Sequence, residues 1–183
     1  MDDLRVSLVQ GNTVWHDPAA NRAAYGALMA PLAGATDLVL LPETFTSGFS
    51  NEALAQAEGM DGPTVAWMLA QARQLDAVVT GSVQLRVGEG VYNRMLWATP
   101  AGELHRYDER HLFRMAREHD RYAAGRERRT FLAQELRGRT RPRQTGQRVV
   151  AAEVHHHVVA IPAVGVRRAA GEGMDIWSQP VDV

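Results

Sequence analysis

The most constraining feature of this sequence is the continuous apolar run Leu38-Val39-Leu40-Leu41, which is followed directly by Pro42 and Glu43. A strand with water on one face alternates apolar and polar residues, whereas a strand buried on both faces is apolar throughout. The run therefore predicts a strand inside a sheet that is covered on both sides. Glu43 follows at the end of this strand, where the ligand sites of helix-covered sheets usually lie.

The neighbouring segments predict alternating strands and helices, followed by an antiparallel meander. Asp17-Pro18 marks a helix start, because Asp caps free N–H groups and Pro tolerates the first helical position. That helix is expected to end near Met29, and a helical apolar stripe predicts a second helix over 61–75. Strands are expected at 4–10, 37–41, 77–84, 91–99 and 104–108. The expected fold class is α/β, with a mixed sheet packed with helices.

The composition excludes several kinds of site. The 183 residues contain no Cys, which rules out disulfides, thiolate metal sites and a cysteine nucleophile. All 20 basic residues are Arg, so the chain has no lysine for a Schiff base or a catalytic ammonium group. Trp15, Trp67 and Trp97 stand beside apolar residues and are expected in the core.

No segment indicates insertion into a membrane or export. The sequence has no apolar run near the length of a membrane-spanning helix. The start, Met1-Asp2-Asp3-Leu4-Arg5, lacks the basic residues and the apolar centre of a secretion signal. Together with the lack of Cys, this predicts a cytoplasmic protein without a membrane partner.

Four segments carry, in order along the chain, the pattern of one enzyme family. They are VSLVQG at 6–11, LVLLPETFTSGFS at 38–50, NRML at 93–96, and YDERHLF at 107–113 with Glu118-His119 and YAAG at 122–125 after it. Together they resemble the nitrilase superfamily of carbon–nitrogen hydrolases. GFSNEA and RHLFRMA are most similar to bacterial omega-amidases. The resemblance covers residues 4–128.

This resemblance implies an α-β-β-α sandwich, in which helices cover two central mixed sheets, with its second half truncated or divergent here. It also implies hydrolysis of a small ω-amide, such as the monoamide of a 2-oxo dicarboxylic acid, to an acid and ammonia. No cofactor and no metal take part. In the family a Glu base takes the proton of a Cys nucleophile, a Lys ammonium stabilises the oxyanion, and a second Glu positions the others. Family members often pair through outer helices, which allows a homodimer.

Position by position, the family's base matches Glu43 and its supporting carboxylate matches Glu118. The family lysine matches position 109, where this sequence has Glu109, and the nucleophile has no counterpart because Cys is absent. The substitution puts a third carboxylate near Glu43 and Glu118, which repels a developing oxyanion where an ammonium would attract it. The resemblance therefore implies a hydrolase that is inactive or impaired.

The character of the chain changes after residue 128, where the carbon–nitrogen hydrolase domain (1–128) is expected to end. Residues 129–148 are rich in Arg and Gly and predict a linker or a disordered segment. Residues 149–183 are a divergent or frameshifted tail, in which the apolar stretch 149–166 could supply one or two edge strands. Its His155-His156-His157 triplet does not favour a metal site, because consecutive residues on a strand face opposite ways.

The sequence leaves a second function open. Thirteen arginines lie between Arg106 and Arg148, and such a cluster can contact phosphates. The alternative is thus a non-catalytic binding protein that uses the Arg-rich region 106–148 to hold an acidic partner. A solvated face plus a disordered segment is the more common meaning of such a pattern, so a nucleic acid is not the expected partner.

Overall fold

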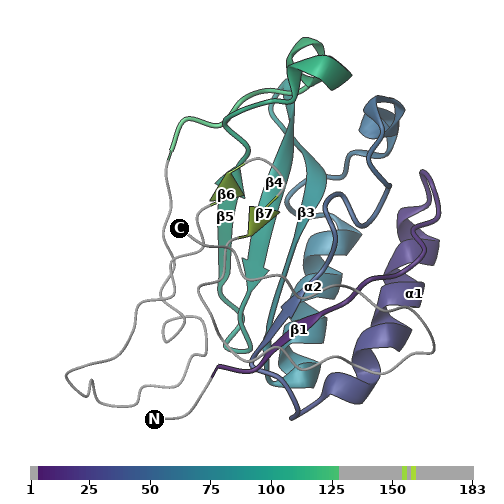
Figure 1. Ribbon diagram of the computed structural model, residues 1–183, viewed down its shortest axis with the longest axis vertical. Coiled ribbons are helices and arrows are strands. Elements are labelled where there is room, and N and C mark those ends of the chain that lie inside the picture. Colours follow the sequence, from purple (N-terminus) through teal and green to yellow (C-terminus); the bar gives the residue numbers. More distant parts are fainter. Residues whose placement is uncertain (1–3, 128–153, 156–157, 160–183) are drawn as a thin grey trace, which may run out of the picture.

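The main sheet has five strands in the order β1-β2-β3-β4-β5 (Figure 1). The computed structural model describes residues 4–127 and two short strands at 154–155 and 158–159. The main strands are β1 (Val6–Leu8), β2 (Leu38–Leu40), β3 (Val78–Val87), β4 (Gly90–Ala98) and β5 (Leu104–Asp108). β1, β2 and β3 run parallel, and β3, β4 and β5 form an antiparallel meander. The mixed sheet and its antiparallel meander confirm the expectation from sequence.

Two helices connect the parallel strands, and both begin where the sequence indicates. α1 (Pro18–Met29) is capped by the Asp17 side chain, which accepts a hydrogen bond from the backbone N–H of Ala20 at 2.9 Å. α2 (Pro63–Leu75) also starts with proline and ends at Asp76, whose φ of 49° turns the backbone out of the helix. These signals use local chemistry alone, which is why they can be read from the sequence.

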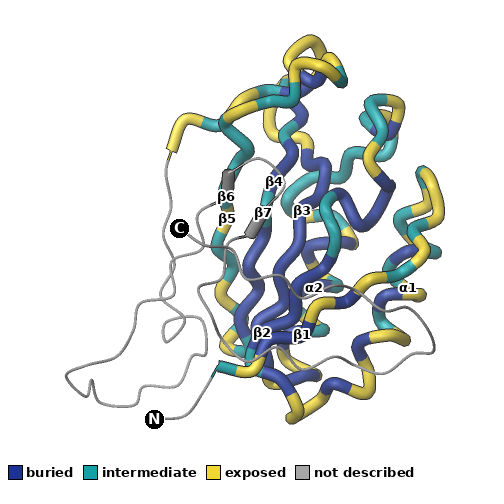
Figure 2. Tube along the Cα trace, viewed as in Figure 1, coloured by how far each residue is buried: buried dark blue, intermediate teal, exposed yellow. Residues whose placement is uncertain are grey.

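The main core lies between the sheet and the two helices, which pack on the same side of it (Figure 1). Tyr25 of α1 meets Phe45 edge to face, with ring centroids 5.7 Å apart. Gly81 of β3 is required for this packing, because a Cβ there would lie 2.8 Å from the Cβ of Leu41 and 3.2 Å from the Phe45 ring. Figure 2 shows buried residues running along the central strands, with exposed residues on the outer side of α1.

The opposite face of the sheet carries a second apolar cluster. Its buried members are Val6, Leu38, Leu40, Val78 and Trp97. Both faces of β2 are therefore apolar, as the continuous run predicts. Trp97 is buried and Trp67 packs against the main core, but Trp15 is 63% exposed, so its expected core position is wrong.

Four short 3-10 turns were not expected from the sequence. They are η1 (Ala30–Leu32), η2 (Asn51–Gln56), η3 (Arg114–Ala116) and η4 (Glu118–Asp120). Turns of this length have no periodic signal that a sequence pattern could show, and of these four only η2 has a side-chain cap, from Ser50. No helix in the described part of the chain is both long and apolar enough to cross a bilayer.

The tail differs from the expectation at one point. β6 (Val154–His155) and β7 (Val158–Val159) pair with each other as a separate two-stranded sheet, and do not extend the edge of the main sheet. Two strands this close in sequence close a hairpin locally, which needs no partner from the main sheet. The expected linker at 129–148 and residues His156 and His157 lie outside the described residues.

An ion pair joins α1 to Glu58 in the segment that leads into α2. Arg22 of α1 donates from Nη1 to Glu58 Oε1 at 2.7 Å and to Thr64 Oγ1 at 2.9 Å. The other Glu58 oxygen accepts the backbone N–H of Thr64 at 2.7 Å, in the first turn of α2. The Arg22 and Glu58 side chains are each 17% exposed, so solvent screens the pair less than a surface ion pair.

We predict that Glu58→Gln lowers the free energy of unfolding by about 1–3 kcal/mol, because it removes a charge-assisted bond and leaves Arg22 without its counter-ion. Urea denaturation followed by tryptophan fluorescence measures the change. The exposed Glu52→Gln is the matched control and should stay within about 0.5 kcal/mol of the unchanged protein. Equal losses in both variants would contradict this role for Glu58.

Candidate functional site

Glu43 stands at the carboxyl end of β2, where the chain turns sharply. The backbone N–H of Leu41 donates to the Thr80 carbonyl at 2.8 Å and continues the ladder one residue past β2. Thr44 then adopts a positive φ of 45°, which is uncommon for a residue other than glycine. Its backbone N–H donates to Ser82 Oγ on β3 at 2.9 Å. The turn that follows Glu43 is therefore fixed to the neighbouring strand.

Asn93 of β4 links two of the carboxylates that the resemblance singles out. Its Nδ2 donates to Glu43 Oε1 at 2.9 Å and to Glu109 Oε2 at 3.0 Å. The Asn93 side chain is buried, whereas Glu43 and Glu109 are partly exposed. One neutral amide thus holds two carboxylates at the same point, and each of its hydrogens satisfies one of them.

Glu109 reaches this point because it continues the meander. Its backbone N–H donates to the Asn93 carbonyl at 3.0 Å, one residue beyond the end of β5. Gly125 N–H in turn donates to the Glu109 carbonyl at 2.7 Å. Gly125 must be glycine, since a Cβ there would lie 2.2 Å from the carbonyl oxygen of Asp108. The last residue of the YAAG stretch therefore lies directly against the strand end that carries Glu109.

Glu118 is 2% exposed and lies in the segment after β5. Its Oε2 accepts the backbone N–H of Phe113 at 2.6 Å, and its carbonyl accepts the N–H of Tyr122 at 2.7 Å. Arg117 precedes it with a positive φ of 58°. Backbone strain of this kind occurs beside both Glu43 and Glu118, and such strain clusters at functional sites.

Three buried polar side chains form a chain of hydrogen bonds beside the carboxylates, which we call the Ser47–Gln84–Tyr122 relay. Ser47 Oγ donates to Gln84 Oε1 at 2.9 Å, and Gln84 Nε2 donates to the Tyr122 hydroxyl at 2.7 Å. Gln84 Nε2 and the Tyr122 hydroxyl also approach the Ser50 carbonyl, both at 3.3 Å. Gln84 stands directly opposite Asn93 in the β3–β4 register.

The Tyr122 hydroxyl reports the negative charge of the site. Burial, together with the charges of Glu118, Glu43 and Glu109, raises the pKa of Tyr122 to about 12, although the hydrogen bond from Gln84 opposes the rise. All three carboxylates therefore act on one phenol, which keeps its proton. The structure brings Glu43 and Glu109 to one amide, and the charges of all three carboxylates reach the Tyr122 phenol.

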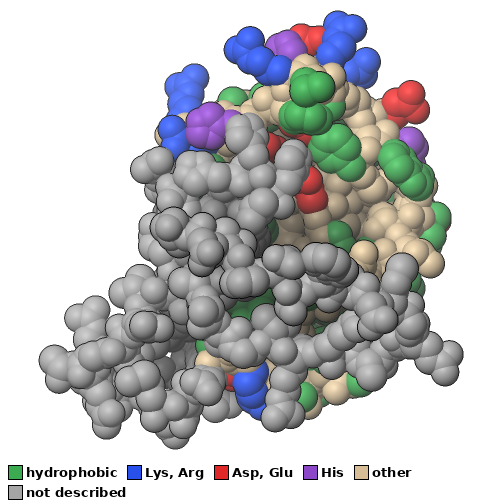
Figure 3. All heavy atoms as spheres, viewed as in Figure 1, with side chains coloured by type: hydrophobic (Ala, Val, Ile, Leu, Met, Phe, Trp, Pro, Cys, Tyr) green, Lys and Arg blue, Asp and Glu red, His purple; other side chains and the backbone are tan. Residues whose placement is uncertain are grey.

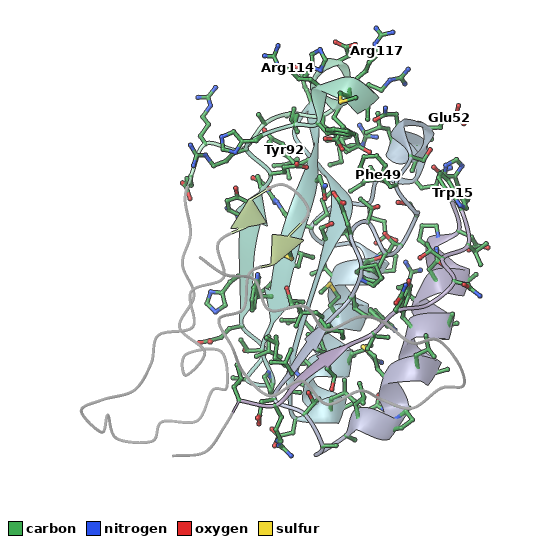
Figure 4. The ribbon with its side chains drawn as sticks, in the orientation of Figure 1. Trp15, Phe49, Glu52, Tyr92, Arg114 and Arg117 are labelled. Carbon is green, nitrogen blue, oxygen red and sulfur yellow. The ribbon has the colours of Figure 1, made fainter. Side chains whose placement is uncertain are left out.

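The loops around the site carry exposed apolar and basic side chains. Phe49 is 41% exposed and Met115 is 88% exposed. Asn51 Nδ2 donates to the Ala116 carbonyl, so η2, which follows Phe49, and η3, which contains Met115, lie together. Figure 3 shows apolar and basic side chains gathered over these upper loops, with acidic side chains below them. In Figure 4 Arg114 and Arg117 point away from the sheet, at the end of the molecule.

Sequence reasoning gave no site role to Gln84, Asn93 or Tyr122, although Asn93 and Tyr122 belong to the matched segments. A signal for the first two was present. Both are polar residues in the interior of a strand, and a polar side chain buried there needs a hydrogen-bond partner. The partners lie far away in the sequence, so the pairing itself could not be read.

The arrangement supplies carboxylates but not the other groups of the family's chemistry. Glu43 is a carboxylate at a strand end that accepts a hydrogen bond from Asn93, and a carboxylate is one of the side chains that can act as a general base. The sequence has neither a thiol nor a lysine ammonium to complete the family's chemistry. Within residues 4–127, no group of three or more His, Asp or Glu side chains could hold a metal ion.

The sequence model of the carbon–nitrogen hydrolase family matches residues 5–166. The chain belongs to this family. The family match continues past residue 128, and the proposed domain boundary there stays a prediction. The nitrilase-superfamily membership that the four sequence segments indicate is confirmed.

Omega-amidases are among the relatives of this carbon–nitrogen hydrolase chain. It is 44% identical over 125 residues to omega-amidase YafV of Escherichia coli K12, a match that covers 68% of this chain and 48% of the relative. It is 33% identical over 94 residues to 2-oxoglutaramate amidase of Bacillus subtilis, covering 50% of this chain and 36% of the relative. The chain spans about half the length of the YafV relatives it matches.

Solved structures share its fold. XC1258 from Xanthomonas campestris, a CN-hydrolase superfamily protein with an arsenic adduct in its active site, is 69% identical with a TM-score of 0.70. That match covers 72% of this chain and 49% of XC1258. Nit3 of Saccharomyces cerevisiae, a nitrilase-superfamily member, is 21% identical with a TM-score of 0.62, covering 70% of this chain and 51% of Nit3. The latter likeness supports the nitrilase fold.

We predict that Tyr122 makes stability fall between pH 10 and pH 12. The pKa of its phenol is about 12 in the folded protein and near 10 in the unfolded chain, so the unfolded chain loses this proton first as the pH rises. The contribution is complete below pH 10 and is lost toward pH 12. Urea midpoints at pH 9 and pH 11 should differ less in Tyr122→Phe than in the unchanged protein. Tyr92→Phe is the control, and an equal effect there would contradict the assignment.

Proposed function

We propose that this chain carries the general base and the supporting carboxylate of an omega-amidase site. Its substrate would be a small ω-amide, such as the monoamide of a 2-oxo dicarboxylic acid. In the chemistry of the family, Glu43 is the general base and Glu118 the supporting carboxylate, while Glu109 occupies the lysine position. The observation that carries the proposal is the Asn93 amide, which joins Glu43 to Glu109. The identity to YafV and to 2-oxoglutaramate amidase supports the substrate class.

The same residues limit what the site can do. Amide hydrolysis by this family needs a nucleophile to attack the carbonyl carbon and a cation to stabilise the oxyanion. Losing one stabilising donor alone typically costs roughly 10²–10³ in rate, and Glu109 adds repulsion to that loss. Because the sequence has no Cys, the nucleophilic step has no thiol either. We therefore propose a site that still binds a small amide but hydrolyses it slowly or not at all.

We predict that a small ω-amide perturbs the backbone NMR signals of Glu43, Asn93 and Thr44, while ammonia release stays near the background rate. Glu43→Ala should abolish this perturbation, because it removes the carboxylate that faces the substrate. The control Glu52→Ala changes an exposed carboxylate on η2 and should leave the perturbation intact. Two results would overturn the proposal: rapid ammonia release that persists in Glu43→Ala, or no perturbation in the unchanged protein.

A second candidate function rests on the exposed arginines between residues 106 and 127. Arg106, Arg114, Arg117, Arg121 and Arg126 are all exposed. The exposed acidic groups among them are few, and one of these, Asp120, is paired with Arg117 at 2.8 Å. We propose, as the alternative, that this end of the molecule holds an acidic partner independently of any catalysis.

Binding to poly-uridylate RNA as a model polyanion tests the alternative. Each arginine that neutralises a phosphate contributes about 0.7 to the slope of log affinity against log salt concentration on a single strand. The double variant Arg114→Ala/Arg117→Ala should therefore lower the slope by about 1.4. Arg73→Ala, an exposed arginine on α2, should leave it unchanged. A slope that is the same in all three proteins would exclude the arginines as a binding surface.

A further inference from the structure

We propose that Gln84 and Tyr122 are positioning residues, which hold the loop that follows Glu43 against the segment that carries Glu118. They do so through the Ser47–Gln84–Tyr122 relay. This inference rests on the proposed function only in treating Glu43 as the base, since the relay itself is a matter of geometry.

The first link of the relay fixes the Glu43 loop. Ser47 lies four residues after Glu43, and its hydroxyl donates to Gln84 Oε1 at 2.9 Å. The backbone N–H groups of Ser47 and Gly48 donate to the Thr44 carbonyl at 3.0 and 2.9 Å, which closes the turn. A turn closed on itself and tied to β3 at Ser47 gives Glu43 a fixed position at the end of β2.

The second link fixes the Glu118 segment. The Tyr122 hydroxyl accepts from Gln84 Nε2 at 2.7 Å, while the Tyr122 backbone N–H donates to the Glu118 carbonyl at 2.7 Å. The Ala123 N–H then donates to the Val91 carbonyl on β4 at 2.8 Å. The Gln84 amide therefore joins two segments that are about 70 residues apart, one behind each carboxylate.

The relay is built to hold position and not to react. Ser47, Gln84 and Tyr122 are 2%, 5% and 7% exposed, so a substrate does not reach them. The phenol of Tyr122 keeps its proton because burial and three nearby carboxylates raise its pKa, and the amide of Gln84 is neutral. Neutral groups with every bond directed at a neighbour supply rigid support without adding charge to a site that is already acidic.

Tyr122→Phe tests the proposal, because it removes one hydroxyl and keeps the ring. One net hydrogen bond is worth about threefold to tenfold in a local opening equilibrium. Amide hydrogen exchange at Thr44, Ser47 and Gly48 should therefore speed up by about that factor, while exchange in α2 should not change. The ¹³C carboxyl signals of Glu43 and Glu118 should shift in the same variant, which a loss of general stability would not produce.

Ser47→Ala is the second variant, and it breaks the relay at the other end. Ser47 has no hydrogen bond to Tyr122 or Glu118. A shift of the Glu118 carboxyl signal in this variant therefore shows that Gln84 and Tyr122 couple the position of Glu118 to that of Ser47. Tyr92→Phe is the control, since the Tyr92 ring lies 5.6 Å from the Arg94 guanidinium and outside the relay. It should leave the Thr44, Ser47 and Gly48 amides and both carboxyl signals unchanged.

Three outcomes would overturn the proposal. They are an unchanged exchange rate in Tyr122→Phe, an equal increase throughout α2 and the loop, and carboxyl signals that do not move in either relay variant. None of these measurements depends on hydrolysis, so the relay can fail while Glu43 still binds an amide. Equally, the relay can be confirmed in a chain that releases no ammonia.

Discussion

The candidate site depends on two buried amide side chains that face each other across the β3–β4 ladder. Gln84 and Asn93 are direct cross-strand partners, and both are about 5% exposed. Asn93 binds the two carboxylates Glu43 and Glu109, whereas Gln84 binds Ser47 and Tyr122. Every segment that contributes to the site is therefore tied to a single pair of positions in the sheet.

Burial explains why this pair organises its surroundings. Burying a primary amide is unfavourable, because it costs free energy for each hydrogen or oxygen that finds no hydrogen-bond partner. Asn93 places its amide nitrogen against the two carboxylates Glu43 and Glu109, which accept its hydrogen bonds. The free-energy cost of burying the amides therefore favours a structure in which the loop after β2 and the segment after β5 approach them. Register within one hairpin fixes the contacts of segments far apart in the chain.

The fold could be predicted from the sequence to the extent that its signals are local. The continuous apolar run before Glu43, the Asp17-Pro18 cap and the stripe of α2 each use the chemistry of neighbouring residues, and each element is present in the structure. The core position predicted for Trp15 was wrong, because apolar neighbours in the sequence do not determine which side of a loop faces the core. The tail strands β6 and β7 pair with each other and not with the main sheet. No local sequence pattern distinguishes between these two pairings.

The site could be predicted only in part, for the same reason. The position of Glu43 follows from its place after a buried strand, and its likeness to the family's base comes from the matched segment. Nothing local to Glu43 indicates that Asn93 donates to it, since the two residues are separated by a turn, a helix and a strand. A buried polar residue in a strand interior, such as Gln84, indicates that a hydrogen-bond partner exists, but not which residue it is.

The scaffold also explains how Glu43 can remain in place without the cation of the family. A site ordered by attraction between Glu43 and a lysine would lose its geometry when that lysine becomes Glu109, because attraction would turn into repulsion. Here the donors to the carboxylates include a neutral amide at Asn93 and a backbone N–H at Phe113. Their hydrogen bonds do not need a cation in the site. Position and charge are therefore separate properties of this site: the sheet determines where the carboxylates lie, and Glu109 adds one negative charge to those of Glu43 and Glu118.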